Sequence, residues 1–391
     1  AWRHYGSVPW RTILDPVVRA CRDGFPLSAA CRYYLGYSGD IVFDRSPDGR
    51  RALRRDDGSL IDTGDTVVIP HLADSLDAIA AEGARVFYEG DIARAVSDHC
   101  VAGGGMLTRE DLATYRAIER EPLLTSIGDW QLATNPPPAV GGAMLTAMLL
   151  ACADLDIEHW DADSLGCLIR SQRVCLDYRQ RHLDFAEDLG DAAASLVDGA
   201  RDGHLIARWT SASTVHTSVV DDNGSGCAIT ASSGYGSGEM AAGTGLWLNN
   251  CLGEIELNRR GLDAGPPGAR LPSNMAPSVA RRDGAILAVG SPGADRITTA
   301  LQQFLLNYLQ LGMPLAAAVA HPRVHVDTSG DSVILKAEPG LDLPDVDLPV
   351  AMFPEIVMYF GGVGAAVFDQ RHGFGVTADP RREGAVLLPD A

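Results

Sequence analysis

The chain has 391 residues, 46% of them hydrophobic and 21% charged, which excludes a disordered protein and predicts a substantial core. Its formal net charge of −19 argues against a nucleic-acid partner, because an acidic surface repels phosphate backbones. No apolar run reaches the roughly 20 residues of a membrane span. The longest run, Ala143 to Ala153, predicts a core helix instead.

The cysteines and histidines give no metal-site pattern. No cysteine pair has CxxC spacing, and His321 and His325 lack an accompanying carboxylate or cysteine cluster. We therefore expect no metal and no cofactor. Scattered thiols in a chain of this size favour a cytoplasmic protein, and Trp2 to Gly6 has no signal-peptide pattern. The eight cysteines are Cys21, Cys31, Cys100, Cys152, Cys167, Cys175, Cys227 and Cys251.

The first half of the chain is predicted to be mostly helical. Apolar residues at helical spacing predict a helix over Thr12–Cys21, which Gly24 and Pro26 end. Pro70 opens a second helix, with apolar residues on one face, that ends near Gly83.

Further helical signals follow along the chain. Thr108–Asp111 has the pattern of a capping box. Gly141-Gly142 leads into the helix over Ala143–Ala153, and a long helix is expected over Ser164–Phe185. The segment Glu187–Trp209 has few large apolar residues, so we expect a surface segment that serves as a linker or a processing loop.

The periodicity changes from helical to alternating at Thr214. The alternating run Val215–Asp221 is separated by Asn223-Gly224 from a second run, Cys227–Thr230, which predicts a β-hairpin. Helices followed by a strand-rich half predict an α+β fold with a boundary at 213/214. Further elements are expected as strands over Ala285–Val289, Val333–Lys336 and Ala365–Phe368, and as a helix over Arg296–Leu311.

Thr214 alone has two interpretations. A β-branched residue at the start of a strand is usually structural. If the preceding peptide bond is cut, however, the new α-amino group lies within reach of the threonine hydroxyl. With a reference pKa of about 7.7–8.0, that amine is the base which a hydroxyl nucleophile needs. Downstream, Gly290–Arg296 is either an ordinary turn before a helix or a loop whose N–H groups stabilise an oxyanion.

Other catalytic motifs are missing from the sequence. It contains neither GxSxG nor HExxH, and Gly103–Gly105 lacks the phosphate-binding patterns, so it predicts a flexible turn. Two polar segments, Asn249-Asn250 and Ser273–Pro277, lie in apolar surroundings between the hairpin and the Gly290 loop. Taken alone, they are typical of turns and caps.

Taken together and in order, these segments resemble the γ-glutamyltranspeptidase family. The similarity spans nearly the whole chain and includes motifs of both subunits of that family. The small-subunit motifs are matched by residues 214–221, 243–250, 270–277, 290–297 and 321–325, and the large-subunit motifs by residues 5–7, 22–26, 107–115 and 136–142.

The resemblance implies an α+β fold of the αββα four-layer sandwich type, the N-terminal nucleophile hydrolase fold. It implies autocatalytic cleavage of a zymogen after Ser213. The products would be a mostly helical large subunit, 1–213, and a strand-rich catalytic small subunit, 214–391, which together form one domain and a heterodimer. Thr214 would form an ester with the acyl group of a γ-glutamyl or related small-molecule amide, as in glutathione metabolism, and water or an amine would release it.

The resemblance also assigns the site. Catalytic roles fall on Thr214, on Ser232 near the position of a supporting threonine, and on Gly293 and Ala294 at the oxyanion glycines. Substrate-binding roles fall on Ser233, Cys251, Glu254, Ser273 and Asn274. The family's carboxylate-binding arginine lies upstream of the first matched motif, so no residue here takes that role.

These departures favour an acyl group other than glutamyl, because several polar contacts to the substrate are altered. One alternative is a biosynthetic relative, such as a C–C bond hydrolase of an antibiotic pathway. A composition rich in Ala, Arg and Asp and poor in Lys suits an actinobacterial source of that kind. The other alternative is a non-catalytic homologue that keeps the fold.

Overall fold

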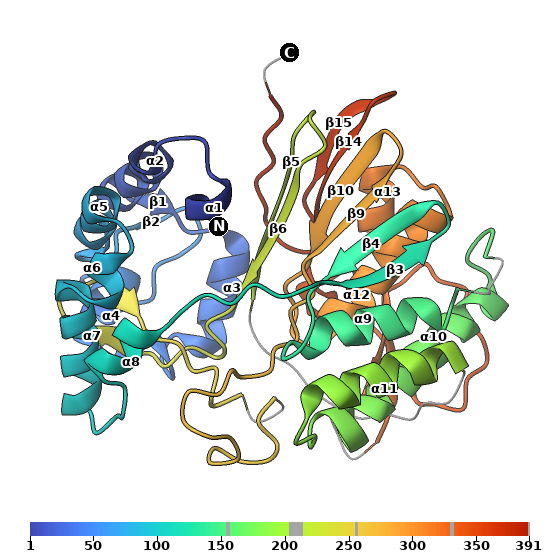
Figure 1. The fold of residues 1–391 in the computed structure, drawn as a ribbon, viewed down its shortest axis with the longest axis horizontal. Coiled ribbons are helices and arrows are strands. Elements are labelled where there is room, and N and C mark those ends of the chain that lie inside the picture. Colours follow the sequence, from blue (N-terminus) through green and yellow to red (C-terminus); the bar gives the residue numbers. More distant parts are fainter. Residues whose placement is uncertain (154–156, 203–213, 255–256, 329–331, 390–391) are drawn as a thin grey trace. The chain divides into compact units, whose positions relative to one another are not determined.

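The computed structural model describes residues 1–153, 157–202, 214–254, 257–328 and 332–389 (Figure 1). The chain divides into two compact units. Unit 1 comprises Ala1–Glu119 and Gly236–Asn250, and unit 2 comprises Arg120–Tyr235 and Cys251–Ala391. Every residue to which the sequence assigns a catalytic or substrate-binding role belongs to unit 2. In the described part of the chain, no helix is long and apolar enough to cross a membrane.

Unit 1 is mostly helical, as predicted. Helix α2 packs against α5, and the Trp10 indole donates a hydrogen bond of 2.9 Å to the Ile79 carbonyl. Its helices are α1 (Trp2–Tyr5), α2 (Trp10–Asp23), α3 (Ala29–Ser38), η1 (Phe43–Arg45), α4 (Pro47–Leu53), α5 (Leu72–Glu82), α6 (Arg85–Tyr88), α7 (Asp91–Ala102) and α8 (Arg109–Thr114). Its short strand pairs are β1 (Phe25–Pro26) with β2 (Thr66–Val67), and β7 (Met240–Ala241) with β8 (Leu246–Trp247).

The local signals in unit 1 are confirmed. The expected Thr12–Cys21 helix lies inside α2, and α5 ends at Gly83, whose φ of 78° suits a residue without a side chain. Thr108 and Asp111 make both hydrogen bonds of the capping box at the start of α8.

Unit 2 is built on a six-stranded antiparallel sheet with the order β15-β14-β10-β9-β4-β3 (Figure 1). The strands of unit 2 are β3 (Leu123–Ile127), β4 (Trp130–Thr134), β5 (Val215–Val220), β6 (Gly226–Ala231), β9 (Ser278–Arg282), β10 (Ala285–Gly290), β11 (Val324–Asp327), β12 (Ile334–Ala337), β13 (Val350–Met352), β14 (Gly364–Asp369) and β15 (Gly373–Thr377). Its helices are α9 (Val140–Leu150), α10 (Ala162–Tyr178), the π-helix η2 (Arg179–Leu183), α11 (Leu189–Asp202), α12 (Arg296–Leu305), the π-helix η3 (Leu306–Gln310), α13 (Leu315–Ala320) and η4 (Met358–Phe360).

Both faces of the central strand β10 are covered. Leu287 and Val289 face the main hydrophobic core, to which α9 and α12 contribute, whereas Ile286 faces the β5–β6 hairpin. All six residues of β10 are therefore buried. In the described part of unit 2, helices therefore cover one face of the sheet and the β5–β6 hairpin covers the other.

Helix α9 begins earlier than predicted. Gly141 and Gly142 lie in its first turn rather than before it. A Cβ at Gly142 would lie 1.9 Å from the Asn135 carbonyl oxygen, so the close approach of the loop requires glycine. Ten of the helix's eleven residues are buried, which agrees with its apolar composition on every face.

The prediction that Glu187–Trp209 is a surface linker or processing loop is wrong over most of this segment. Residues Leu189–Asp202 form α11, which packs against α9. Ala193, Leu196 and Ala200 are buried in the main core at helical spacing, with Leu196 fully inaccessible. Residues 203–209 lie outside the described residues.

Two other predicted helices are shorter than expected. The Ser164–Phe185 helix is α10, which ends at Tyr178 and continues as the π-helix η2. The Arg296–Leu311 helix is α12, which continues as η3. The three strands expected after residue 280 correspond to β10, β12 and β14, each within one residue at either end.

The hairpin that follows Thr214 is confirmed. Strands β5 and β6 are antiparallel, and Gly224 in the turn has a φ of 84°. Side chains alternate between the two faces of the hairpin: Val215, Val219 and Ile229 are 68%, 57% and 55% exposed, whereas the intervening residues of β5 are half-buried.

Candidate active site

Thr214 is a buried residue directly before β5, with 9% of its surface exposed. The packing of the hairpin shows where it points. Gly226, opposite Val220, lies against Ile286 near the start of β10, while His216 lies against Gly290 at its end. Strands β5 and β10 therefore run in opposite directions. Thr214, directly before β5, lies toward the turn that follows Gly290 at the end of β10.

Ser232 lies across the hairpin from Thr214. The last paired residues are Val215 and Ala231, so the register places Thr214 and Ser232 opposite each other, one step beyond that pair. Directly opposed residues have Cβ atoms about 4.5–5.5 Å apart. The Ser232 hydroxyl accepts a hydrogen bond of 3.0 Å from the Gly234 N–H, which fixes the chain after β6.

Cys251 and Glu254 join the same group of residues. The Cys251 thiol lies 3.9 Å from the Ser232 carbonyl oxygen, and the Glu254 N–H donates to the Cys251 carbonyl over 3.3 Å. Glu254 is 4% exposed, whereas Ser233 is on the surface. Burial raises the pKa of the Cys251 thiol, and the neighbouring Glu254 raises it further, so this thiol is not activated as a nucleophile.

The turn between β10 and α12 has an unusual backbone. Gly293 has a φ of 130°, and Ala294 has a φ of 63°, a left-handed conformation that L-residues rarely adopt. Both residues are buried. A Cβ at Gly293 would lie 2.8 Å from the Gly361 Cα, so the neighbouring chain leaves no room for a side chain. Backbone strain of this kind clusters at functional sites.

The N–H groups of Gly293 and Ala294 make no hydrogen bond to any other residue that the structure describes. Their carbonyls, by contrast, accept from the Arg296 and Ile297 N–H groups over 3.0 and 3.2 Å. Buried N–H groups without partners are rare in folded proteins. Two consecutive N–H groups of this kind before a helix are able to donate to a negatively charged oxygen.

Loop 360–363 lies behind this turn and holds it. The Gly362 N–H donates to the Ser291 hydroxyl over 3.0 Å. The loop is anchored in turn, because the Arg323 guanidinium donates to the Phe360 carbonyl over 2.9 Å and the Val363 N–H donates to Asp379 over 2.7 Å. The turn is therefore fixed through residues far from it in sequence.

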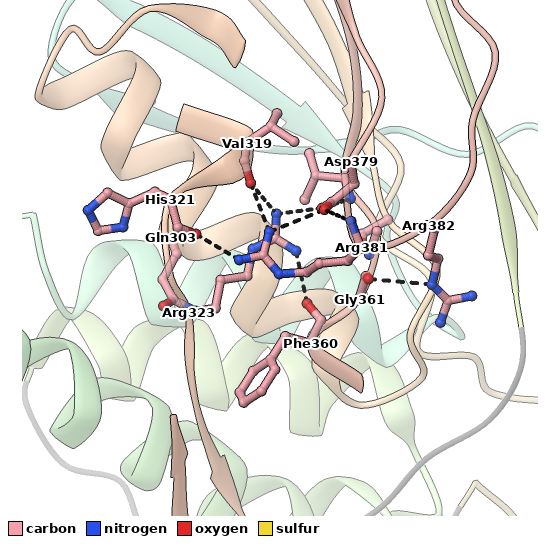
Figure 2. Close-up of polar contacts among 12 residues, drawn as sticks. Gln303, Val319, His321, Arg323, Phe360, Gly361, Asp379, Arg381 and Arg382 are labelled. Carbon is pink, nitrogen blue, oxygen red and sulfur yellow. Dashed lines mark hydrogen bonds and ion pairs between the residues drawn. The ribbon is translucent and has the colours of Figure 1, made fainter. Parts of the chain in front are cut away.

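A fully buried ion network anchors loop 360–363, and Figure 2 shows most of it. Arg323 pairs with Asp379 over 2.6 Å, and Arg381 pairs with Asp379 over 3.2 Å. Arg381 also pairs with Glu338, with a distance of 2.7 Å between Nε and Oε1, and donates to the His321 carbonyl over 2.9 Å. Two cations meet two anions here, so the buried charges compensate each other.

A second polar cluster surrounds Tyr359, the residue directly before loop 360–363. The Arg296 guanidinium contacts the Tyr359 ring at 4.5 Å and donates to the Tyr359 carbonyl over 3.0 Å. The Tyr359 hydroxyl donates to Asp327, which also pairs with Lys336, the only lysine of the chain. The Lys336 ammonium itself lies 4.5 Å from the Tyr359 ring centroid.

Ser273 and Asn274 lie at the start of α9. The Val140 N–H donates to the Ser273 carbonyl over 2.9 Å, and the Asn274 amide oxygen accepts from the Arg179 guanidinium over 2.6 Å. Arg179 pairs with Asp184 over 2.9 Å, and Arg259 pairs with the other oxygen of Asp184 over 3.1 Å. Burial raises the pKa of Asp184, against the lowering effect of both arginines.

Two buried donors in this cluster stay without a partner among the described residues: Arg179 Nη2 and Asn274 Nδ2. Because Arg179 occupies the amide oxygen of Asn274, only the amide NH₂ is left to contact anything else. The cluster of Arg179, Asp184 and Arg259 carries one more positive than negative charge. It therefore suits a hydrogen-bond acceptor or a carboxylate.

His321 and His325 have structural partners. His325 is buried, with Nδ1 3.1 Å from the Thr299 hydroxyl and Nε2 3.8 Å from Asp295, and burial lowers its pKa to about 4. His321 offers its carbonyl to Arg381. Within the described ranges, no group of three or more His, Cys, Asp and Glu side chains is arranged to hold a metal ion.

The structure thus relates Thr214, Ser232, Cys251 and Glu254 through register and contact, and places Gly293 and Ala294 at the end of the strand toward which Thr214 points. Asn274, by contrast, is joined to Arg179. Sequence reasoning missed Arg179. Its position continues the buried stripe of Leu168, Gln172 and Leu176 at helical spacing, which was the available signal.

Nearly the whole chain matches a known protein family. The family described as Gamma-glutamyltranspeptidase matches residues 1–388. This chain belongs to the γ-glutamyltranspeptidase family. The sequence resemblance is thereby confirmed across the whole chain.

Named relatives within this family are proenzymes. The chain is 30% identical over 357 residues to the glutathione hydrolase proenzyme of Escherichia coli (strain K12), which covers 82% of this chain and 61% of the relative. It is 29% identical over 348 residues to the acylase ACY 1 proenzyme of Pseudomonas sp. (strain SE83), with 83% and 62% covered. The chain thus spans about three fifths of the length of these relatives.

Solved structures share the fold. The cephalosporin acylase from Bacillus halodurans aligns with a TM-score of 0.82 at 20% identity, over 100% of this chain and 76% of that one. At this identity the likeness concerns the fold alone. It confirms the predicted α+β fold, which this chain shares with that acylase.

Proposed function

We propose that this family member is an amide-cleaving hydrolase or acyltransferase in which Thr214 is the N-terminal nucleophile. The observation that carries the proposal is the pair of buried N–H groups at Gly293 and Ala294, which make no hydrogen bond to the part of the chain that the structure describes. These N–H groups lie in the turn that follows β10, and Thr214 lies at the end of β5 nearest to that turn. A nucleophile and an oxyanion site at one place are what acyl transfer needs.

The reaction would run through an ester on Thr214. The hydroxyl attacks the substrate carbonyl while the α-amino group of Thr214 takes the hydroxyl proton, and the Gly293 and Ala294 N–H groups stabilise the oxygen anion. The α-amino group then gives the proton to the leaving amine as the C–N bond breaks. Water or an amine acceptor attacks the ester and releases the acyl group.

The amine that acts as base requires cleavage after Ser213. We propose that the Thr214 hydroxyl attacks the carbonyl carbon of residue 213 and that the C–N bond then breaks, which leaves an ester on Thr214 and frees its α-amino group. Hydrolysis of the ester releases the carboxylate of residue 213 and frees the Thr214 hydroxyl. Ser213 itself lies outside the described residues. The products would be a large subunit, 1–213, and a small subunit, 214–391, that stay together as one domain and a heterodimer.

The remaining predicted residues have supporting roles in this proposal. Ser232, opposite Thr214, would hydrogen-bond the nucleophile, and buried Glu254 would hold a substrate ammonium together with Ser233 and Cys251. Ser273 and Asn274 would bind the far end of the acyl group. Asn274 Nδ2 and Arg179 Nη2 are suited to a carboxylate or carbonyl there.

The substrate would be a γ-glutamyl or related amide. Relatives named as glutathione hydrolase and as acylase both support an amide, and the acylase name supports an acyl group other than glutamyl. An altered biosynthetic substrate, including a C–C bond in an antibiotic pathway, is the second candidate. It is favoured by Asn274, since the sequence resemblance places Ser273 and Asn274 where that family has two serines. The cytoplasmic location suggested by the cysteines stays a prediction.

Intact mass spectrometry tests the nucleophile. The wild-type chain is expected to give two fragments that meet at 213/214 and to turn over an amide substrate, and Thr214→Ala is expected to do neither. Thr214→Ser is the matched control, because it keeps a hydroxyl and should retain partial cleavage. A wild-type chain that stays intact yet active would refute the proposal.

A pair of anilides then separates the substrate candidates. Faster release of aniline from γ-glutamyl anilide than from glutaryl anilide, which lacks the ammonium group, favours a γ-glutamyl substrate held by Glu254. The reverse order favours an acylase. Cleavage without turnover of either anilide favours the altered biosynthetic substrate.

A further inference from the structure

A gap in the central sheet lies between the predicted nucleophile and the oxyanion turn. Gly290 and Gly364 are directly paired across β10 and β14, so two neighbouring positions lack side chains on the face toward the hairpin. The imidazole of His216 fills this gap. A Cβ at Gly290 would lie 2.3 Å from both Cε1 and Nδ1 of His216, which no real contact permits.

Hydrogen bonds fix the imidazole within the gap. Nδ1 lies 2.8 Å from the Thr230 hydroxyl, Nε2 lies 2.7 Å from the Ser218 hydroxyl, and the Ser218 hydroxyl donates to the Gly364 carbonyl over 3.1 Å. The chain of contacts therefore runs from β6 through β5 to β14. It ties both hairpin strands to the sheet at the gap.

The directions of these hydrogen bonds follow from the number of protons. The Ser218 hydroxyl has one proton, which it gives to the Gly364 carbonyl, so it must accept from His216 Nε2–H. Nδ1 of the neutral ring then has only a lone pair and accepts from the Thr230 hydroxyl. The arrangement selects the neutral Nε2–H tautomer of His216.

Among the residues that the structure describes, the polar contacts of His216 are uncharged. They are Thr230, Ser218 and, through Ser218, the Gly364 carbonyl, and the ring packs on glycine backbone. Burial in these surroundings lowers the pKa of His216 to about 4. The ring therefore stays neutral, and the hydrogen-bond directions stay the same, across the neutral pH range.

We propose that His216 is a positioning residue for acyl transfer, whose neutral imidazole in the Gly290–Gly364 gap fixes the separation of Thr214 from the Gly293–Ala294 turn. His216 lies two residues after Thr214, and Gly290 lies three residues before Gly293. The contact between His216 and Gly290 is therefore close in sequence to both the nucleophile and the turn. The inference rests on the proposed function, because it assigns a geometric role to a residue outside the reaction itself.

The two glycines of the gap give a matched pair of variants. In Gly290→Ala the new Cβ would overlap the His216 ring and displace the hairpin. In Gly364→Ala the new Cβ would lie 3.5 Å from His216 Cδ2, an ordinary contact. A displacement of about 1 Å can cost about 100-fold in rate. We therefore expect Gly290→Ala to lower kcat about 100-fold with little change in KM, and Gly364→Ala to resemble the wild type.

A double variant separates displacement of the ring from general damage. In His216→Ala/Gly290→Ala the ring is gone, so the added methyl group has room, and the thermal midpoint should be no lower than in His216→Ala alone. If the decreases in thermal midpoint of the two single variants add up in the double variant, the proposal is overturned. So would a Gly290→Ala chain with wild-type Tm and kcat, or a His216→Ala chain with wild-type kcat.

Two readouts do not depend on turnover. The thermal midpoints of the four variants test the gap even if the wild-type chain is inactive and the proposed function fails. In ¹⁵N-histidine NMR spectra of the full chain, His216 is expected to be the Nε2–H tautomer from pH 6 to pH 8. An Nδ1–H tautomer or a charged ring in that range would overturn the assigned hydrogen-bond directions.

Discussion

The turn at Ser291–Ala294 and the hairpin that follows Thr214 are held in opposite ways. The turn is buried on all sides and anchored through loop 360–363 by the ion network of Arg323 and Asp379. The hairpin has only two strands, and one of its two faces is largely exposed. A two-stranded hairpin is marginally stable by itself, so it depends on its inner contacts with the sheet.

This difference indicates how the work is divided in the proposed site. An oxyanion site is effective when its donors are fixed before the reaction, since then nothing has to reorganise. In the proposed mechanism, the strand that carries Thr214 has to accommodate a chain that is continuous with residue 213 before cleavage and separate from it afterwards. A turn that is anchored on several sides suits the first demand, and a hairpin that is held through its inner face alone suits the second.

The largest expected effect comes from breaking the ion network on the turn side. Arg381→Ala leaves Glu338 and Asp379 buried without one of their partners and should cost about 3–5 kcal/mol of unfolding free energy. Urea denaturation measures the loss. Arg94→Ala, which removes an exposed pair with Asp91 in unit 1, should cost less than about 1 kcal/mol. Equal losses in both variants would contradict the comparison.

Acid should weaken both regions. The pKa values of His325 and His216 are lowered by burial to about 4, below the value of about 6.5 in an unfolded chain. Protons therefore bind more strongly to the unfolded chain, and stability that is complete above pH 6.5 is lost as the pH falls toward 4. For a fully buried histidine the loss approaches about 3 kcal/mol.

Unfolding midpoints measured between pH 7.5 and pH 4.5 check this expectation. His325→Gln on the turn side and His216→Gln on the hairpin side should each flatten the curve. A wild-type midpoint that is constant over this range would show that neither ring is held neutral.

Gly293→Ala tests the turn itself. The φ of 130° and the approach of Gly361 exclude a side chain, so we expect a loss of about 1–3 kcal/mol in stability. Acyl transfer should fall further, by about 100-fold or more, because the donors would move. Gly36→Ala in α3, where the new Cβ finds its nearest neighbour at 3.6 Å, is the control and should be neutral or stabilising. If Gly293→Ala has the stability and the acyl-transfer rate of the wild type, the turn is not rigid.

The smallest effect is expected on the exposed face of the hairpin. Val219→Thr keeps the β-branched shape of a side chain that is 57% exposed, so stability should change by less than about 0.5 kcal/mol. Thermal unfolding and the rate of self-cleavage are the measurements. A large loss would mean that another surface covers this face.

The parts of the fold that local chemistry specifies were predictable. The Asn223-Gly224 turn, the end of α5 at Gly83 and the Thr108–Asp111 capping box each depend on residues close together in sequence, and each is confirmed. Helix α11 was missed because its small residues are buried only through contact with α9. Composition alone therefore suggested a surface segment.

The site divides in the same way. Thr214 and the Gly293–Ala294 turn were found because their motifs resemble a family in order, and their roles stay predictions that the unpartnered N–H groups support. The anchoring pairs were missed, because Arg323 and Asp379 are 56 residues apart, and Arg381 and Glu338 are 43 apart. No local pattern links charges over such distances.

The single lysine has a practical consequence for following maturation. Lys336 is the only side-chain amine of the chain, and the segment upstream of Thr214 contains none. Before cleavage, an amine-specific isotopic tag can mark the region 214–391 only at Lys336. Cleavage before Thr214 would add a second tag there, on the amine that we propose as the catalytic base. Counting tags on that fragment would therefore measure, molecule by molecule, how much of a preparation carries a mature nucleophile.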